Sequence, residues 1–140
     1  MIRQIPFLII VLLFFVSSCG QSTQDENQLM RDRIISIHDE VMPLMGKLKS
    51  LEKKANQEIK SLEDEENANP ERIVELKALV VDLDAAYEGM FDWMHQYEIE
   101  DGEKSPEEVK EYLDDQLIKV TEVNSQFKEV LAKADELLPT

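Results

Sequence analysis

The sequence predicts an all-α protein, an antiparallel up-down-up three-helix bundle with coiled-coil-like packing. Three observations predict this fold. Apolar residues recur every three or four positions over long stretches, which is the repeat of one helix face. Glycine and proline are scarce, at 4 and 5 of 140 residues, and no stretch alternates between apolar and polar residues as a strand does. Two short polar stretches, near residues 68 and 102, read as turns, and short turns make neighbouring helices antiparallel.

The length and charge of the chain limit what it can be. A chain of 140 residues is long enough for one small domain. It carries 30 acidic and 15 basic side chains, a net charge of −15. Such a surface repels nucleic acid and anionic lipid headgroups. We therefore expect no nucleic-acid partner and no direct binding of the domain to a membrane surface.

The first 18 residues have the pattern of a signal peptide. Arg3 supplies a positive N-terminal region, and an apolar run from Ile5 to Val16 follows it. This run is short for a membrane-spanning helix and has the length of a signal-peptide core. We predict that residues 1–18 are a cleaved signal peptide and that residues 19–27, which are polar, form a flexible tether.

The signal region ends in Val16-Ser17-Ser18-Cys19, which resembles the lipobox of bacterial lipoproteins. Val16 stands where that group usually has leucine. The resemblance implies cleavage before Cys19 and attachment of diacylglycerol to its sulfur. Cys19 is the only cysteine, so the chain cannot form a disulfide of its own. Gly20 replaces the aspartate that retains many such proteins at an inner membrane, which favours a lipid anchor in the outer membrane of a bacterial envelope. The alternatives are an ordinary secretory signal cleaved near Ser18 and an uncleaved anchor.

The predicted bundle occupies residues 28–138, and its first helix covers about 28–66. Proline at position 43 lies inside the apolar pattern of this helix, so we expect a kink there with helix on both sides. The apolar face is built from residues that step by four and three: Met30, Ile34, Ile37, Val41, Leu44, Leu48, Leu51, Ala55, Ile59 and Leu62.

The second and third helices are predicted over about 70–99 and 105–138. Asn69 can cap the second helix, and Pro70 suits its first position. Ser105, followed by proline and by Glu108 three residues after the cap, is a strong start for the third helix. One flank of the second helix carries three apolar residues seven positions apart, through which the bundle could form a homo-oligomer: Leu79, Ala86 and Trp93.

Histidine and methionine side chains gather at one end of the predicted bundle. Folding the chain about position 68 brings the stretch around Met42 to the level of the stretch around Met94. Thioether and imidazole groups suit Cu(I), so a soft-metal or haem site is one interpretation. Core packing is the other, because methionine commonly fills gaps in helical bundles. The candidate metal ligands are His38, Met42, Met45, Met94 and His95.

Aromatic side chains gather at the same end. Trp93 and Tyr97 could form an exposed groove for an apolar ligand or peptide, as in an envelope chaperone or adaptor. They could equally close the end of the core. No catalytic motif accompanies them, since the chain lacks G-x-S-x-G, Walker and H-E-x-x-H patterns. We predict neither enzymatic activity nor a resident cofactor.

Two stretches carry a family resemblance. Residues 38–46, His-Asp-Glu-Val-Met-Pro-Leu-Met-Gly, together with Phe91-Asp92-Trp93-Met94-His95 and Glu111-Tyr112-Leu113, resemble small helical lipoproteins of Bacteroidetes. Those proteins often bear the label "viral A-type inclusion protein", which reflects their coiled-coil character. The resemblance covers about residues 30 to 130 and implies a source of that type. It implies no activity.

These observations predict a lipid-anchored envelope protein that acts as a non-enzymatic structural or binding module. Its partners would be the membrane, through lipid on Cys19, and a protein partner or a second copy. The two alternatives are a copper- or haem-handling protein that uses the His/Met cluster, and a chaperone or adaptor that uses Trp93 and its neighbours.

Overall fold

The computed structural model describes residues 19–67 and 69–138, with side chains from residue 23 onward; the predicted signal peptide lies outside the described residues. The described chain is all-helical, as predicted, and contains no strand. Its elements are α2 (Cys19–Val41), the 3-10 turn η2 (Met42–Leu44), α3 (Met45–Glu63), α4 (Pro70–Gln96) and α5 (Pro106–Leu137).

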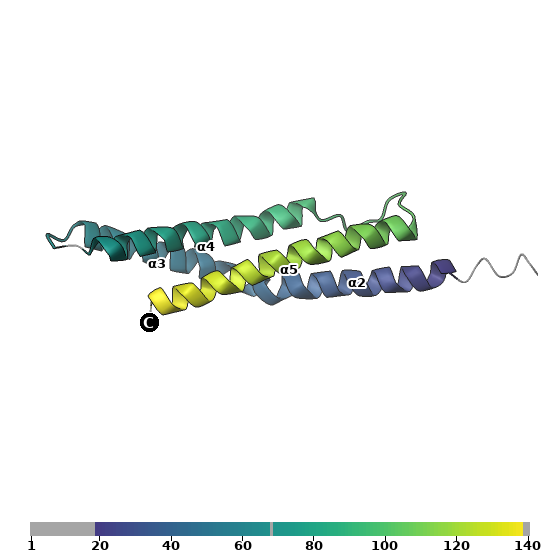
Figure 1. Ribbon diagram of the computed structural model, residues 1–140, viewed down its shortest axis with the longest axis horizontal. Helices are drawn as coiled ribbons and strands as arrows, with labels where there is room; N and C mark the ends of the chain where they lie inside the picture. Colours follow the sequence, from purple (N-terminus) through teal and green to yellow (C-terminus); the bar gives the residue numbers. More distant parts are fainter. Residues whose placement is uncertain (1–18, 68, 139–140) are drawn as a thin grey trace, which may run out of the picture.

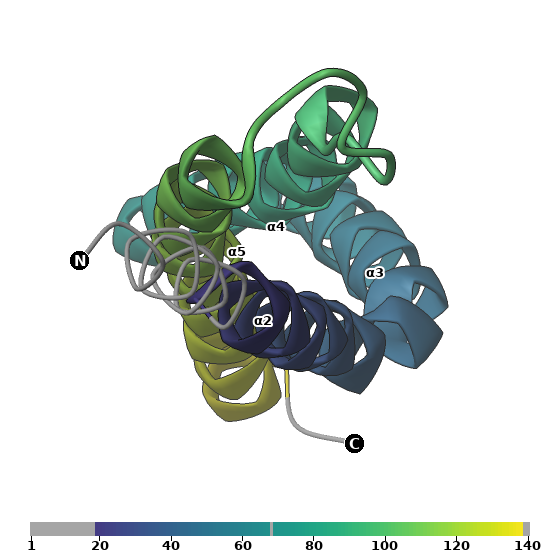
Figure 2. The ribbon, with the colours of Figure 1, turned by 90° about the vertical axis from the view of Figure 1, so that its right-hand side faces the viewer.

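The helices lie side by side in an elongated molecule (Figure 1). α2 packs against α5, α3 packs against α4, and α4 also packs against α5. The turn between α3 and α4 lies at one end of the molecule, and the loop between α4 and α5 lies at the other (Figure 1). Viewed along the bundle, α2 lies beside α5 and α3 beside α4 (Figure 2).

The first helix begins earlier than the sequence analysis predicted. It starts at Cys19 rather than Gln28, so helix replaces the flexible tether expected over residues 19–27. The apolar face explains the difference. Stepping back from Ile34 by seven residues reaches Asn27, which is only 6% exposed. A side chain buried there holds this part of the chain in the helix.

Pro43 interrupts the first helix where the sequence predicted a kink. The structure has the 3-10 turn η2 at Met42–Leu44, with α-helix on both sides. Proline has no N–H to donate to the carbonyl of Asp39, so the α-helical ladder cannot continue through it. The chain changes direction at this turn, and α3 diverges from the line of α2 (Figure 1).

Caps fix the starts of α4 and α5 as predicted. The side-chain oxygen of Asn69 accepts hydrogen bonds from the backbone N–H groups of Glu71 at 3.1 Å and Arg72 at 3.3 Å. At α5, the Glu108 N–H donates to Ser105 Oγ at 3.3 Å, and the Ser105 N–H donates to a Glu108 carboxylate oxygen at 2.8 Å. This capping box satisfies backbone donors that a helix start leaves without partners.

The helix ends differ slightly from the prediction. α3 ends at Glu63 and α4 at Gln96, each three residues before the predicted end. Four acids occupy residues 63–66, and negative charge at a helix C-terminus opposes the helix dipole. α4 stops where the backbone of Tyr97 becomes extended.

The core runs along the length of the bundle and draws on every helix. It is built largely from the predicted apolar positions, with Met30, Ile37, Leu51 and Leu62 packed half-buried at its margin. The largest fully buried side chains are Phe127, Ile34, Leu48, Leu76, Leu79, Leu83, Met90, Leu113, Val41 and Val120.

The flank of α4 that we considered for homo-oligomerisation is buried within the chain. Leu79 is 0% exposed, Ala86 4% and Trp93 5%, so this flank is not available as a surface for a second copy. The reason is that α4 packs against two helices, α3 and α5, and needs two apolar faces. The sequence analysis treated this flank as separate from the face of the helix that packs within the bundle.

The capping box of α5 predicts a pH dependence of stability. The backbone N–H of Ser105, and then its side chain, hold the pKa of Glu108 below its ordinary value of 4.5. A carboxylate whose pKa is lowered by folding stabilises the fold above its unfolded-state pKa, and that stability is lost as the pH falls through the folded-state pKa. We expect Glu108→Gln to unfold at lower urea concentration than the native chain at neutral pH. The difference should shrink as the pH falls below 4.5.

Urea unfolding of both proteins at a series of pH values measures this difference. Glu107→Gln is the matched control, because Glu107 lies in the same helical turn and takes no part in the capping box. A difference for Glu108→Gln that stays constant with pH, or that equals the difference for Glu107→Gln, would contradict the prediction.

Candidate functional site

The methionines of the predicted His/Met cluster belong to the core. Met45 is 9% exposed and counts among the buried core residues. Met42 and Met94 are half-buried and pack against the same core. Their sulfur atoms therefore have apolar surroundings, which is the ordinary role of methionine in a bundle.

The two histidines contact different rings. The Nδ1 atom of His38 lies 2.9 Å from a carboxylate oxygen of Asp39, and its ring centroid lies 5.6 Å from that of Trp93. His95 is exposed, and its ring centroid lies 6.4 Å from that of Phe91. Among residues 19–67 and 69–138, no group of three or more His, Cys, Asp or Glu side chains could hold a metal ion. The soft-metal interpretation remains a prediction without support from this geometry.

Trp93 closes one end of the core. Its side chain is 5% exposed and stacks on Tyr97, with ring centroids 5.0 Å apart and an interplanar angle of 28°. Tyr97 in turn lies 6.3 Å from Tyr112, at 26°. Trp93 therefore forms part of the interior rather than the exposed groove that one interpretation required, whereas Tyr97 and Tyr112 are half-buried.

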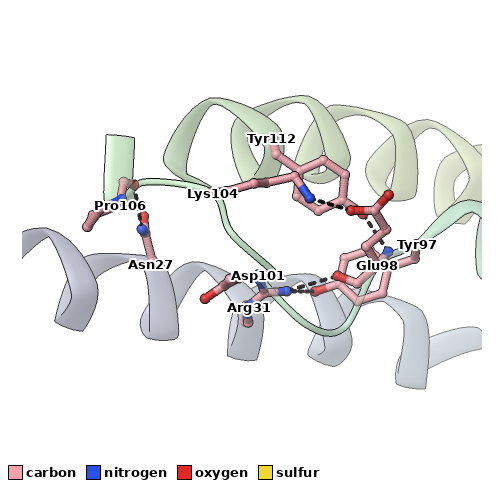
Figure 3. Close-up of polar contacts among 8 residues, drawn as sticks. All are labelled: Asn27, Arg31, Tyr97, Glu98, Asp101, Lys104, Pro106 and Tyr112. Atoms are coloured by element: carbon pink, nitrogen blue, oxygen red, sulfur yellow. Dashed lines mark hydrogen bonds and ion pairs between the residues drawn. The ribbon is translucent and has the colours of Figure 1, made fainter. Parts of the chain in front are cut away.

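Arg31 forms a polar site with three partners, which the sequence analysis missed. Its guanidinium donates to the carbonyl oxygen of Glu98 at 3.1 Å and to the hydroxyl of Tyr97 at 3.4 Å, and it pairs with the carboxylate of Asp101. Figure 3 shows these contacts between α2 and the loop at residues 97–105. Burial lowers the pKa of Arg31, but the hydrogen bonds to Tyr97 and Asp101 outweigh it and raise that pKa.

Three further contacts hold the same loop (Figure 3). The side-chain amide of Asn27 donates to the carbonyl oxygen of Pro106 at 2.8 Å. The backbone N–H of Glu98 donates to the hydroxyl of Tyr112 at 2.6 Å, and burial raises the pKa of that hydroxyl. Lys104 pairs with the Glu98 carboxylate at 2.6 Å. We call Arg31, Asn27 and the loop residues they bind the polar clamp. The apolar repeat continued back from Ile34 was the signal that could have found Asn27.

A second polar contact joins α2 to α5 in the middle of the bundle. The amide of Asn124, 6% exposed, donates to the carbonyl oxygen of Ile37 at 2.7 Å and to a carboxylate oxygen of Glu40 at 3.3 Å. Lys128 donates to the same carboxylate at 2.5 Å. The hydrogen bonds from Lys128 and Asn124 lower the pKa of Glu40. This contact fixes α2 one turn before η2.

Two buried polar atoms lack a hydrogen-bond partner among the described residues: Nε1 of Trp93 and Oε1 of Gln116. Gln116 is 4% exposed and lies among the buried residues of α5, between Leu113 and Val120. Each lies four residues from a ring of the Tyr97–Tyr112 pair. Burying a polar atom without a partner costs free energy of folding.

The surface hollows lie away from the His/Met cluster. A pocket of about 380 Å³ borders the polar clamp, and a groove of about 410 Å³ runs between α4 and α5. None of the residues lining either hollow is a histidine, methionine or aromatic residue. The pocket is lined by Gln24, Asn27, Gln28, Arg31, Asp101, Gly102, Lys104, Pro106 and Val109, and the groove by Asp82, Ala85, Ala86, Gln126, Glu129, Val130 and Lys133.

Comparison with known proteins adds no relative. No protein-family model, curated protein or solved structure matches the chain. The resemblance to Bacteroidetes lipoproteins therefore stays a prediction. Within the part of the chain that the structure describes, no helix has both the length and the apolar character needed to cross a bilayer.

The polar clamp predicts a large effect of replacing Arg31. Arg31→Met keeps the apolar stem of the side chain but removes every donor to the loop. Because hydrogen bonds to charged groups contribute about 1.5–3 kcal/mol, we expect the free energy of unfolding to fall by about that amount. Urea unfolding measures the loss, and hydrogen exchange should show faster exchange of the loop amides.

Arg33→Met is the matched control, because Arg33 is exposed on the same helix. Equal stability of the Arg31 and Arg33 variants, with loop amides as protected as in the native chain, would show that the clamp does not hold the loop.

The unpartnered oxygen of Gln116 predicts a gain in stability. Gln116→Leu replaces a buried polar group with an apolar one of similar size. Removing a buried acceptor without a partner should raise the free energy of unfolding by about 1–3 kcal/mol. Gln126→Leu, at an exposed position of the same helix, should change it little. The variant also removes the hydrogen bond that the Gln116 amide donates to Asp115 at 3.2 Å. A loss of stability larger than this one bond supplies would reveal a partner for the oxygen in solution.

Proposed function

We propose that this protein is a lipid-anchored, non-enzymatic binding module of the bacterial envelope, held in the outer membrane through Cys19. The signal-like N-terminus and the residues before Cys19 support the anchor. The observation that carries the binding role is on α4. Two faces of this helix pack against α3 and α5, yet its third face also presents apolar side chains, with Val74 and Val81 each 66% exposed.

We further propose an up-down-up order for the three packed rods, the first formed by α2 and α3. The short connections at residues 64–69 and 97–105 favour it, as antiparallel neighbours require short loops. In this arrangement the polar clamp stands at the end nearest the lipid. It would keep that end rigid, so that the exposed face of α4 is held at a defined distance from the membrane.

The anchor is tested by labelling cells that express the full chain with radioactive palmitate. We expect the native chain to incorporate label and to sediment with membranes, because the acyl chains of a diacylglycerol attached to the cysteine sulfur would hold it there. Cys19→Ser should lose both properties, whereas Ser17→Ala, which keeps a small residue in the signal region, should retain them. Equal labelling of the native chain and Cys19→Ser would contradict the lipid-anchor proposal.

A further inference from the structure

One face of α4 is apolar and uncovered. Val74, Ala78, Val81 and Ala85 step by four, three and four residues, so they share one side of the helix. All four are exposed, and the two valines are 66% exposed. We call these four residues the outer stripe. It spans three turns, roughly 17 Å at the rise of an α-helix.

The outer stripe is continuous with hollows at both ends. An open depression of about 470 Å³ surrounds its first residue and is lined by Pro70, Glu71, Val74 and Glu75. At its other end, Ala85 also lines the groove of about 410 Å³ between α4 and α5, where Ala86 and Val130 form the apolar floor. The alanines leave room for the ridge of a second helix, because small side chains allow helix axes to approach closely.

The charges beside the outer stripe identify the kind of partner. On the helix surface it is flanked by four acids and a single lysine. Lys77 is paired with Glu63 at 2.7 Å, so its charge is already offset. Three of the acids are offset in the same way, Asp82 by Lys133 at 2.6 Å, Asp84 by Lys49 at 2.8 Å and Glu75 by Arg72 at 3.8 Å. The whole chain carries a net charge of −15, and a second copy facing this surface would bring acids against acids. The flanking acids are Glu75, Asp82, Asp84 and Glu88, of which Glu88 has no cationic partner among the described residues; Glu71, beside Val74 at the other end of the outer stripe, has none either.

We propose that the outer stripe docks an amphipathic helix of another protein, whose apolar face is bordered by lysine or arginine. This inference rests on the proposed binding function and names the partner class. The docked helix lays its apolar residues over Val74, Val81 and the groove, as in other helix-in-groove recognition. Its basic residues lie against Glu71 and Glu88 at the two ends of the outer stripe, which orients the helix and rejects acidic ones.

The test uses the mature, lipidated chain in detergent micelles and three helix-stabilised synthetic peptides of about four turns. One has a leucine stripe flanked by lysines, the second has glutamates in place of the lysines, and the third is a scrambled form of the first. Fluorescence anisotropy measures binding. We expect only the first peptide to bind, and added salt to weaken it because salt screens the flanking charges.

Two matched variants locate the site. Val81→Ser removes apolar area from the outer stripe and should weaken binding about tenfold. Ile118 on α5 is 61% exposed, close to the 66% of Val81, and Ile118→Ser should leave binding unchanged. Circular dichroism checks that both variants stay helical.

Three outcomes would overturn the proposal. They are equal binding of the lysine and glutamate peptides, unchanged binding by Val81→Ser, and a dimer of the free protein in sedimentation that Val81→Ser abolishes. Photo-crosslinking in cells from position 81, with position 118 as control, distinguishes failure of the basic-helix proposal from failure of the proposed binding function. A discrete adduct from position 81 alone, together with no affinity for basic peptides, would leave a binding module with a different partner class. The absence of both an adduct and peptide affinity would contradict the docking proposal and the proposed binding function together.

Discussion

The packing of α4 against two helices at once is the constraint on which the rest of the structure depends. Facing both α3 and α5, α4 must be apolar over more of its circumference than a helix with one partner. Leu76 and Leu83 bury one part of that surface, and Leu79 and Trp93 extend it around the helix. The direction change at η2 lets α2 pack on α5 while α3 packs on α4, so both ends of α4 acquire neighbours.

Apolar repeats hold such a bundle together but do not fix how the helices are shifted along one another, because many shifts bury similar areas. In this bundle, long-range polar contacts fix how the helices are aligned along one another. Asn124 binds the backbone of α2 in the middle, and Arg31 holds the loop at one end. Arg72 acts at the other end, where it pairs with Glu58 at 2.8 Å and donates to the carbonyl oxygen of Leu137. Each contact is satisfied in one alignment only, which favours a single structure over its neighbours.

The same arrangement separates scaffold from surface. The methionines and Trp93 pack in or against the core, and the polar clamp binds the loop at one end, so the residues with the most distinctive chemistry stabilise the bundle. The residues left over are chemically plain: valines and alanines along α4, bordered by acids. Such a surface suits the binding role that we propose, in which a partner helix is recognised by shape and charge.

The sequence by itself determined the helical class, the starts of α4 and α5, and the interruption at Pro43. These features depend on interactions between residues at most about four positions apart, such as the capping box of Ser105, so the local sequence is enough to predict them. Only the tertiary structure decided that Asn27 lies in the fold, that Arg31 binds a loop 66 to 70 residues away, and which stripe of α4 stays uncovered. Those outcomes depend on which helices become neighbours. A helix that is apolar on several sides does not reveal which side its partners will cover, because periodicity alone does not distinguish one apolar face from another.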